Sequence, residues 1–250
     1  MSLPQTMRLW RTSTIFKPGR MYLHQQGPSH STVMHEQALP TQQEPRFLSK
    51  TQPSRNGSIE TLISQIPLVQ TLRKSHIYKE SRPHLAIPPA TRQHHFVGGS
   101  LAGPGKLAMA PFTWTTSEGG TSSVVSVFHI GHDLCGHPGF VHGGLLGVLF
   151  DEVFARCVSA AFSSGLGMTA NLNVDFRKPA LPDRVYVLRA NTVKVEGRKA
   201  WVEGRMTYLP AVVKDGESVV KEEELREDCE GAVMVSEAKA LFIEPKFADS

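Results

Sequence analysis

The sequence predicts an α+β fold in which an antiparallel sheet wraps around one long central helix. Residues 137–157, HPGFVHGGLLGVLFDEVFARC, form an apolar run with helical spacing that begins near a Gly-Gly pair. Residues 167–176, GMTANLNVDF, alternate between polar and apolar side chains, as a half-buried strand does. Further strand patterns flank both segments, and several strands around a single helix indicate one sheet packed on that helix.

The composition of the 250-residue chain is that of an ordinary globular protein, with 40% hydrophobic and 20% charged residues and a formal net charge of +4. Its lysines and arginines do not cluster with interleaved aromatic residues, so we expect no nucleic-acid partner. Three cysteines without a CxxC spacing favour neither a disulfide framework nor a zinc site. The longest apolar stretch, residues 138–150, is too short to form a membrane span.

Residues 1–55 form a basic extension, and residues 1–35 contain no acidic residue. The segment MRLWRTSTIFKPGR within it is typical of a short amphipathic mitochondrial presequence. The residues that follow are low in apolar content, which equally favours a plain disordered tail. The predicted location is therefore mitochondrial or cytoplasmic.

Residues 56–105 are predicted to contain a docking helix and a covering loop. The helix spans residues 57–80, with Ser58 as its N-cap. Pro67 is expected to kink or restart this helix because proline removes a backbone donor. Residues 81–105 are rich in proline and glycine and are expected to form an extended loop that covers another part of the fold.

Residues 106–247 are predicted to form the main domain. In chain order we expect a hairpin over 106–131, the long helix, the alternating strand at 167–176, a hairpin over 184–209, a charged loop at 214–230 and a last strand over 231–244. The first hairpin turns at Glu118-Gly119-Gly120 and the second at Glu196-Gly197.

Gly143 and Gly144 stand where the long helix is expected to begin. In a helix interior each would cost roughly 1 kcal/mol relative to alanine. In the first turn they let a ligand approach backbone N–H groups that have no helical partner, and the positive end of the helix dipole favours a developing oxyanion there. The alternative interpretation is that the glycines allow close packing against the sheet, and the two interpretations are compatible.

Asp151 is an acidic residue without an ordinary explanation. Its neighbours three and four positions away are Gly147, Val148, Phe154 and Ala155. A carboxylate on such an apolar face is unfavourable unless it is hydrogen-bonded or has a function. Glu152, by contrast, has Arg156 four residues later, a pair that is common on solvated faces. Asp151 is therefore the stronger functional candidate.

Gly143 and Asp151 are eight residues apart, which is about 12 Å along one helix. One carbonyl group cannot easily contact both, so an Asp151 that acts on the same carbonyl should come from a second subunit. A two-fold dimer would build two identical sites. The sequence does not distinguish a homodimer from a homotetramer.

The motif GFVHGG, Asp151 nine residues after His142, and GMTANLNVDFRKPA together resemble the hotdog-fold acyl-CoA thioesterases of the phenylacetyl-CoA thioesterase-like type. The chain is also similar to the mitochondrial long-chain acyl-CoA thioesterases of animals and to their fungal relatives. The core resemblance covers residues 105–245, and HGG is specific only in combination with the other two features. It implies a hotdog fold and thioester hydrolysis without a cofactor.

The resemblance also implies roles for individual residues. The backbone N–H of Gly143 would polarise the thioester carbonyl, and Asp151 of the partner subunit would act as general base or nucleophile. Thr169 matches a hydroxyl that positions water or the carboxylate. His142 matches the motif histidine, which binds the carbonyl or caps the helix. His137 lies near the position where many relatives carry Asn or Gln, so the second carbonyl contact stays open.

The candidate substrate-binding residues are His137, Gly144, Asn171, Arg177 and Lys178. In the family, basic residues near the strand end that holds Arg177 and Lys178 meet the phosphates of coenzyme A; the alternative is a solvated strand end. Asn171 is expected to share the polar face of its strand, whose members are Thr169, Asn171, Asn173 and Asp175.

Other chemistries lack their motifs. No GxSxG nucleophile elbow occurs, and in GSLAGPGK the final lysine is followed by leucine, which a phosphate-binding loop does not have. The histidines match neither HExxH nor a Cys/His spacing, so no metal is predicted. We therefore predict hydrolysis of acyl-CoA. The alternatives are a thioesterase acting on a carrier-protein-bound polyketide or acyl chain, a hotdog dehydratase, and a non-catalytic acyl-CoA-binding protein.

Overall fold

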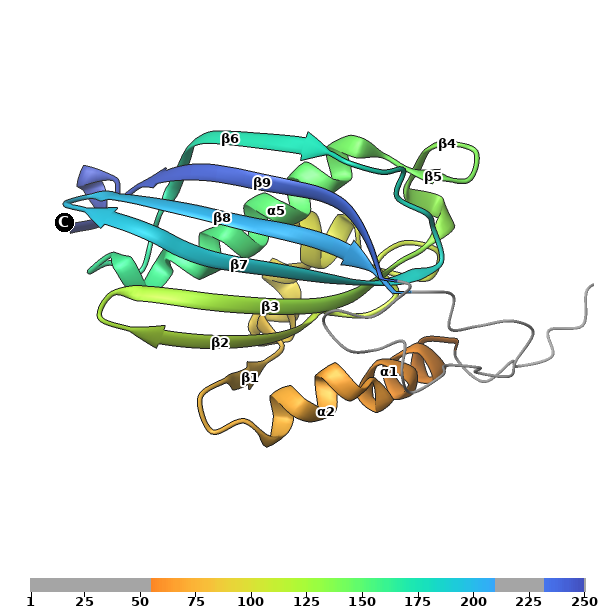
Figure 1. Ribbon diagram of the computed structural model, residues 1–250. Helices are drawn as coiled ribbons and strands as arrows, with labels where there is room; N and C mark the ends of the chain where they lie inside the picture. The colour runs from red at the N-terminus through yellow and green to blue at the C-terminus, as the bar shows by residue number, and fades with distance from the viewer. Residues whose placement is uncertain (1–54, 210–231, 250) are drawn as a thin grey trace, which may run out of the picture. The chain divides into compact units, whose positions relative to one another are not determined.

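The computed structural model describes residues 55–209 and 232–249. The predicted basic extension, apart from its last residue, and the charged loop at 214–230 lie outside the described residues. Within them, a seven-stranded antiparallel sheet wraps around α5 (Gly143–Val158), as Figure 1 shows. The prediction of a hotdog fold of the α+β class, with the sheet around one long helix, is confirmed.

The strands lie in the order β1-β2-β3-β7-β8-β9-β6. They are β1 (Lys79–Ser81), β2 (Phe112–Glu118), β3 (Thr121–Ile130), β6 (Met168–Phe176), β7 (Arg184–Glu196), β8 (Lys199–Tyr208) and β9 (Val233–Ile243). A separate hairpin of β4 (Cys135–His137) and β5 (Phe140–Val141) immediately precedes α5. Single 3-10 turns occur at His132–Leu134, Ser159–Ala161 and Lys246–Asp249.

Both predicted hairpin turns are confirmed. Gly119 and Gly120, between β2 and β3, have φ angles of 57° and 81°. Gly197, between β7 and β8, has a φ angle of 56°. Glycine adopts these left-handed backbone conformations without steric cost, so the sequence determines the position of both turns.

The main core lies between α5 and the inner face of the sheet. Phe150 and Phe154 of α5 are fully buried, with their ring centroids 5.4 Å apart. They share this core with Phe128, Tyr186 and Phe242, which come from β3, β7 and β9. Each such ring contributes about 1.5–3 kcal/mol by burial, so these contacts fix the helix against the sheet.

Gly204 of β8 packs directly against Phe154 of α5, and we predict that Gly204→Ala destabilises the protein. An added Cβ would lie 2.7 Å from Cε1 of Phe154 and would also meet the backbone oxygen of Arg189. Overpacking of this kind typically costs about 1–3 kcal/mol in the free energy of unfolding. Urea denaturation measures this cost. The exposed Lys239→Ala serves as the control, and a Gly204→Ala protein as stable as that control would contradict the prediction.

Two helices cover part of the outer face of the sheet. They are α1 (Arg55–Gln65) and α2 (Pro67–Lys74). Ile63 of α1, Val69 of α2 and Ile66 between the two helices form a second core with side chains of β2, β3 and β7, among them the fully buried Trp114. This packing places the N-terminal helices on the side of the sheet opposite α5.

Two details of the predicted helix are wrong. Because α1 begins at Arg55, Ser58 lies inside the helix and is not its N-cap. The helical region ends at Lys74, well before residue 80, because residues 79–81 pair with the edge of β2 as strand β1. The predicted restart at Pro67 is confirmed, since α1 ends at Gln65 and α2 begins with the proline.

The prediction of an extended loop over residues 81–105 is also wrong. The segment contains α3 (Pro83–Ala86), α4 (Pro89–Arg92) and a π-helical turn at Phe96–Ser100. Both short helices begin with proline, whose fixed φ angle suits the first helical position. Val97 of the π-helical turn belongs to the main core, so the segment closes one side of that core.

Among the helices described, none has the length and apolar character needed to cross a membrane.

Candidate active site

The first two backbone N–H groups of α5, those of Gly143 and Gly144, differ in whether a ligand can bind them. His142 precedes the helix in an extended conformation, and its Nδ1 accepts the N–H of Gly144 at 2.9 Å. No acceptor is found for the N–H of Gly143 among residues 55–209 and 232–249. The Gly143 N–H is therefore the one that a ligand oxygen can reach, whereas the Gly144 N–H is already bonded.

His142 takes the capping role, which is one of the two roles that the sequence left open. Its Nδ1 caps the helix, so the neutral imidazole carries its proton on Nε2. The side chain is exposed, which leaves this Nε2–H as a second donor beside the Gly143 N–H. Capping by His142 thus orients the ring and is compatible with binding a carbonyl oxygen.

Phe176 borders the same helix start and was not among the predicted site residues. Its Cε1 and Cζ lie 3.5 Å from the position where a side chain on Gly143 would begin, and the residue is 58% exposed. The available signal was the alternation of its strand, which placed Phe176 on the apolar face. Sequence spacing could not reveal that this face meets the beginning of α5.

The hairpin of β4 and β5 lies beside His142. The backbone N–H of His142 donates to the carbonyl oxygen of Leu134, the residue before β4, at 2.9 Å. A Cβ on Gly136 of β4 would lie 2.9 Å from Cδ2 of the His142 ring. His137 is the next residue of this hairpin and is exposed. The structure therefore places His137 on the hairpin that packs against the start of α5.

Asp151 lies in the middle of α5 and is hydrogen-bonded to Thr169 of β6. The hydroxyl of Thr169 donates to Oδ1 of Asp151 at 2.5 Å. Asp151 is only partly buried and Thr169 is exposed, so solvent can reach the pair. The structure thus brings together two of the predicted catalytic residues that are 18 positions apart in the sequence.

A β-bulge in β6 produces this contact. Thr169 lies opposite Phe242 of β9, but Asn171 lies opposite Leu241, so Ala170 is an extra residue in the ladder. Because Phe242 is buried in the core around α5, Thr169 faces the helix.

The prediction that Thr169 shares a face with Asn171, Asn173 and Asp175 is therefore wrong. A bulge shifts the two-residue period by one position, so the residues after Ala170 take the opposite faces. Asn171 lies on the outer face of the sheet, away from Asp151. We omit Asn171 from the site proposed below.

We predict that Thr169→Val lowers turnover about 10-fold in any reaction that uses the Asp151 carboxylate. The substitution keeps the shape of the side chain and removes the hydroxyl, and a hydrogen bond to a charged group is worth about 1.5–3 kcal/mol. Thr169→Ser retains the donor and is expected to stay near wild type. Equal turnover numbers for the valine and serine variants would contradict this role.

Gly143 and Asp151 lie on one uninterrupted helix, Gly143–Val158. Their separation is therefore about 12 Å, at a rise of about 1.5 Å per residue. Within one chain the candidate residues form two groups, one of His142 and Gly143 and one of Asp151 and Thr169. Neither group alone contains both the open N–H of the helix start and a carboxylate.

Glu152 is more tightly held than the sequence predicted. Its expected partner Arg156 lies 3.7 Å away, but Oε1 of Glu152 is also 3.0 Å from Nε2 of His84. His84 is 5% exposed. The hydrogen bond with His84 lowers the pKa of Glu152 below its usual range, although burial opposes this shift. The predicted pair of Glu152 and Arg156 is confirmed, but it is only partly exposed, and Glu152 has a second, buried partner in His84.

Arg177 and Lys178 follow directly after β6. Both backbone N–H groups donate to the carbonyl of Val235, at 2.8 and 3.2 Å. The Arg177 guanidinium is paired with Glu237 and lies 3.6 Å from Asp175, and the bond with Glu237 raises its pKa. Binding of a phosphate at Arg177 would compete with these carboxylates, whereas Lys178 is exposed at the same strand end.

In the described part of the chain, no three His, Cys, Asp or Glu side chains are grouped as a metal site.

Residues 138–208 match the family model described as the thioesterase superfamily. The match includes both residue groups of the site. It confirms the resemblance that the GFVHGG motif, the spacing of Asp151 and the following strand predicted.

Three relatives illustrate the similarity. The first, MIOREX complex component 3 of Saccharomyces cerevisiae, is 30% identical over 60% of this chain and 58% of its own length. Acyl-coenzyme A thioesterase THEM4 of Rattus norvegicus is 36% identical over 44% of this chain and 52% of its own. A Candida albicans protein named "Uncharacterized protein, mitochondrial" is 24% identical over 76% of this chain and 82% of its own. The chain thus matches little more than half the length of the first two.

Proposed function

Residues 138–208 match the thioesterase superfamily, and from this premise we propose that the chain hydrolyses an acyl-CoA thioester to a free acid and coenzyme A. The observation that carries the proposal is the hydrogen bond between Asp151 of α5 and Thr169 of β6. The same helix begins with the Gly143 N–H, which is free to bind an oxygen. The printed name of the THEM4 relative favours acyl-CoA as the substrate.

The proposed reaction uses backbone and side-chain groups of this chain only. The Gly143 N–H and the Nε2–H of His142 bind the carbonyl oxygen and stabilise the negative charge that develops on it. Asp151 takes a proton from water as the water oxygen attacks the carbonyl carbon. The tetrahedral intermediate then expels the thiolate of coenzyme A, which takes the proton that Asp151 received from water, so Asp151 returns to its carboxylate form. A direct attack by the Asp151 carboxylate would use the same arrangement, with hydrolysis of an anhydride as the second step.

The two groups would act on one carbonyl across a two-fold dimer. The face of α5 that carries Asp151 also carries Gly147, Val148 and Ala155, and all are only partly buried in the single chain. Beside it, β6 is an edge strand whose Met168 and Phe176 are more than half exposed. An apolar face next to an open strand edge favours association with a second copy. A partner helix alongside α5 would place each Asp151 near the opposite helix start.

We further propose that the protein acts in the mitochondrion. The Candida albicans relative carries that location in its name, and the basic, acid-free first 35 residues are typical of a presequence. A fluorescent fusion of the full chain, compared with one that lacks residues 1–35, tests the location. Loss of mitochondrial signal in the shortened fusion is the expected result, and cytoplasmic signal in both would contradict it.

Release of free thiol from a series of acyl-CoAs of increasing chain length tests the activity. The same acyl groups on a carrier protein distinguish the two thioester substrates. Turnover of one or more CoA esters, with carrier-bound esters slower, is the expected result. A folded protein that hydrolyses only carrier-bound esters would replace acyl-CoA as the substrate, and one that hydrolyses neither would contradict the proposal.

A further inference from the structure

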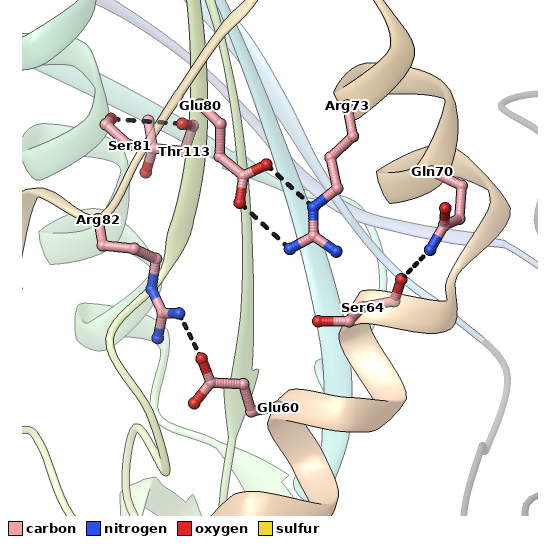
Figure 2. A network of polar contacts seen from close by, with 8 residues as sticks. All are labelled: Glu60, Ser64, Gln70, Arg73, Glu80, Ser81, Arg82 and Thr113. Atoms are coloured by element: carbon pink, nitrogen blue, oxygen red, sulfur yellow. Dashed lines mark hydrogen bonds and ion pairs between the residues drawn. The ribbon is translucent and has the colours of Figure 1, made fainter.

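An anchored segment of chain runs from the outer helices to α5. We define the strap as residues 82–97, which follow β1. At its beginning, Nη1 of Arg82 is 2.6 Å from Oε1 of Glu60 in α1, as Figure 2 shows. The same guanidinium lies 4.0 Å from the ring centroid of Phe112. The strap is thus attached at its first residue to α1 and to the sheet.

A second arginine strengthens this attachment. Arg73 of α2 makes two bonds to the carboxylate of Glu80, at 2.9 and 3.1 Å (Figure 2). Its guanidinium lies 5.1 Å from the ring centroid of Phe112. Glu80 belongs to β1, two residues before Arg82. Bidentate pairs of this kind restrict geometry more than single contacts do. The strand that leads into the strap is therefore held at the same point.

The strap then inserts His84 against α5. Its Nε2 lies 3.0 Å from Oε1 of Glu152, and the residue is almost fully buried. Two neighbours confine the ring. The ring centroid of His95, in the strap, is 5.4 Å away, and a Cβ on Gly98, directly after the strap, would lie 3.1 Å from Cγ of His84. A buried imidazole enclosed in this way has little rotational freedom. The bond between His84 and Glu152 is consequently a fixed point on α5.

Glu152 follows Asp151 on α5, and adjacent helical residues project about 100° apart around the axis. Thr169 of β6 bonds to Asp151, while the strap bonds to Glu152. The core contacts hold α5 against the sheet, and two bonds from different elements at consecutive positions add a local restraint on its rotation at Asp151. A displacement of about 1 Å at a reacting group can cost up to 100-fold in rate.

We propose that His84 is a positioning residue that holds Asp151 in its working orientation through Glu152. The inference rests on the proposed function, in which Asp151 activates water. His84 contacts neither the helix start nor the Asp151 carboxylate, so it takes no part in the chemistry. Its loss is expected to lower kcat and to leave KM nearly unchanged, because the groups that bind the carbonyl and coenzyme A lie elsewhere.

The test compares the full-length variants His84→Ala and His84→Gln in thiol release from the best acyl-CoA. Glutamine places an amide N–H near the position of Nε2 and can donate to Glu152. We expect kcat to fall about 10-fold in His84→Ala with KM within about 2-fold, and His84→Gln to recover most of the loss. His94→Ala, an exposed histidine of the same strap, is the control and is expected to match wild type.

Glu152→Ala removes the acceptor on α5 and keeps the test decisive if His84→Ala folds poorly. The double variant His84→Ala/Glu152→Ala is expected to lose no more kcat than Glu152→Ala alone, because both substitutions remove one bond. The positioning role is overturned if wild type is active and Asp151→Asn is not, while folded His84→Ala and Glu152→Ala keep the wild-type kcat. A wild type that releases no thiol overturns the proposed function first, and the positioning role with it.

Discussion

Asp151→Asn is expected to reduce acyl-CoA hydrolysis by at least 100-fold, while the protein folds as wild type does. General base catalysis by a positioned carboxylate contributes about 10²–10⁴ to rate, and an amide cannot accept the proton of the attacking water. The asparagine oxygen can still accept the Thr169 hydroxyl, which donates to Asp151 at 2.5 Å in the native chain. The loss should therefore appear in kcat and leave the thermal stability close to that of wild type.

A matched control for this variant is Asp175→Asn, which makes the same chemical change on the outer face of β6. It is expected to hydrolyse acyl-CoA at the wild-type rate. The assay is release of free thiol under single-turnover and steady-state conditions. Retention of more than a tenth of the wild-type kcat in Asp151→Asn would remove Asp151 from the reaction.

Gly143→Pro is expected to lose about 100-fold or more in kcat, because proline deletes the N–H proposed to bind the oxyanion. Proline suits this position: Gly143 is the first residue of α5, and the extended backbone of His142 is the conformation that a residue before proline prefers. Gly143→Ala introduces the same Cβ, which would contact only the Phe176 ring at an ordinary 3.5 Å, and keeps the N–H. Alanine is therefore expected to retain most activity.

The pair of glycine variants separates the N–H from the space around it. Equal losses in Gly143→Pro and Gly143→Ala would mean that the added Cβ, and not the missing donor, impairs the reaction. Circular dichroism and thermal denaturation of both proteins verify that α5 still forms. A fully active Gly143→Pro would exclude this N–H as the group that stabilises the oxyanion.

Mixing the two inactive variants tests whether the site spans two subunits. In a dimer of one Asp151→Asn chain and one Gly143→Pro chain, one site has both native residues and the other has neither. Random re-association in a two-fold dimer would thus restore about a quarter of the wild-type activity. No recovery after denaturation and refolding together would show that both residues act from the same chain.

Much of the fold follows from local sequence signals. The turns at Gly119-Gly120 and Gly197 require left-handed backbone conformations that glycine adopts freely, and the long apolar run predicts α5. The error at Ser58 has a simple cause, since good capping residues also occur inside helices. Residues 81–105 were expected to form an extended loop because they are rich in proline and glycine, yet prolines of this segment occupy the first turns of α3 and α4.

The candidate site also has features that local sequence predicts and contacts that it does not. Asp151 is a functional candidate because it interrupts an apolar helix face, and this interruption can be seen in the sequence alone. Its bond to Thr169 depends on the bulge at Ala170, and the pairing of β6 with β9 creates that bulge. His84 is 68 residues from Glu152, so no spacing rule relates them. Glu152 was assigned to a solvated pair because its i+4 neighbour offered a sufficient local explanation.

The central helix, its glycine-containing start, the hairpin turns and the candidacy of Asp151 follow from local sequence, because each depends on residues within one or two turns of chain. The three-dimensional fold was needed to establish which way Thr169 faces, that Phe176 lies beside Gly143, and that His84 bonds to Glu152. These depend on strand register and on contacts between distant segments, which burial of a common core selects and local preference does not.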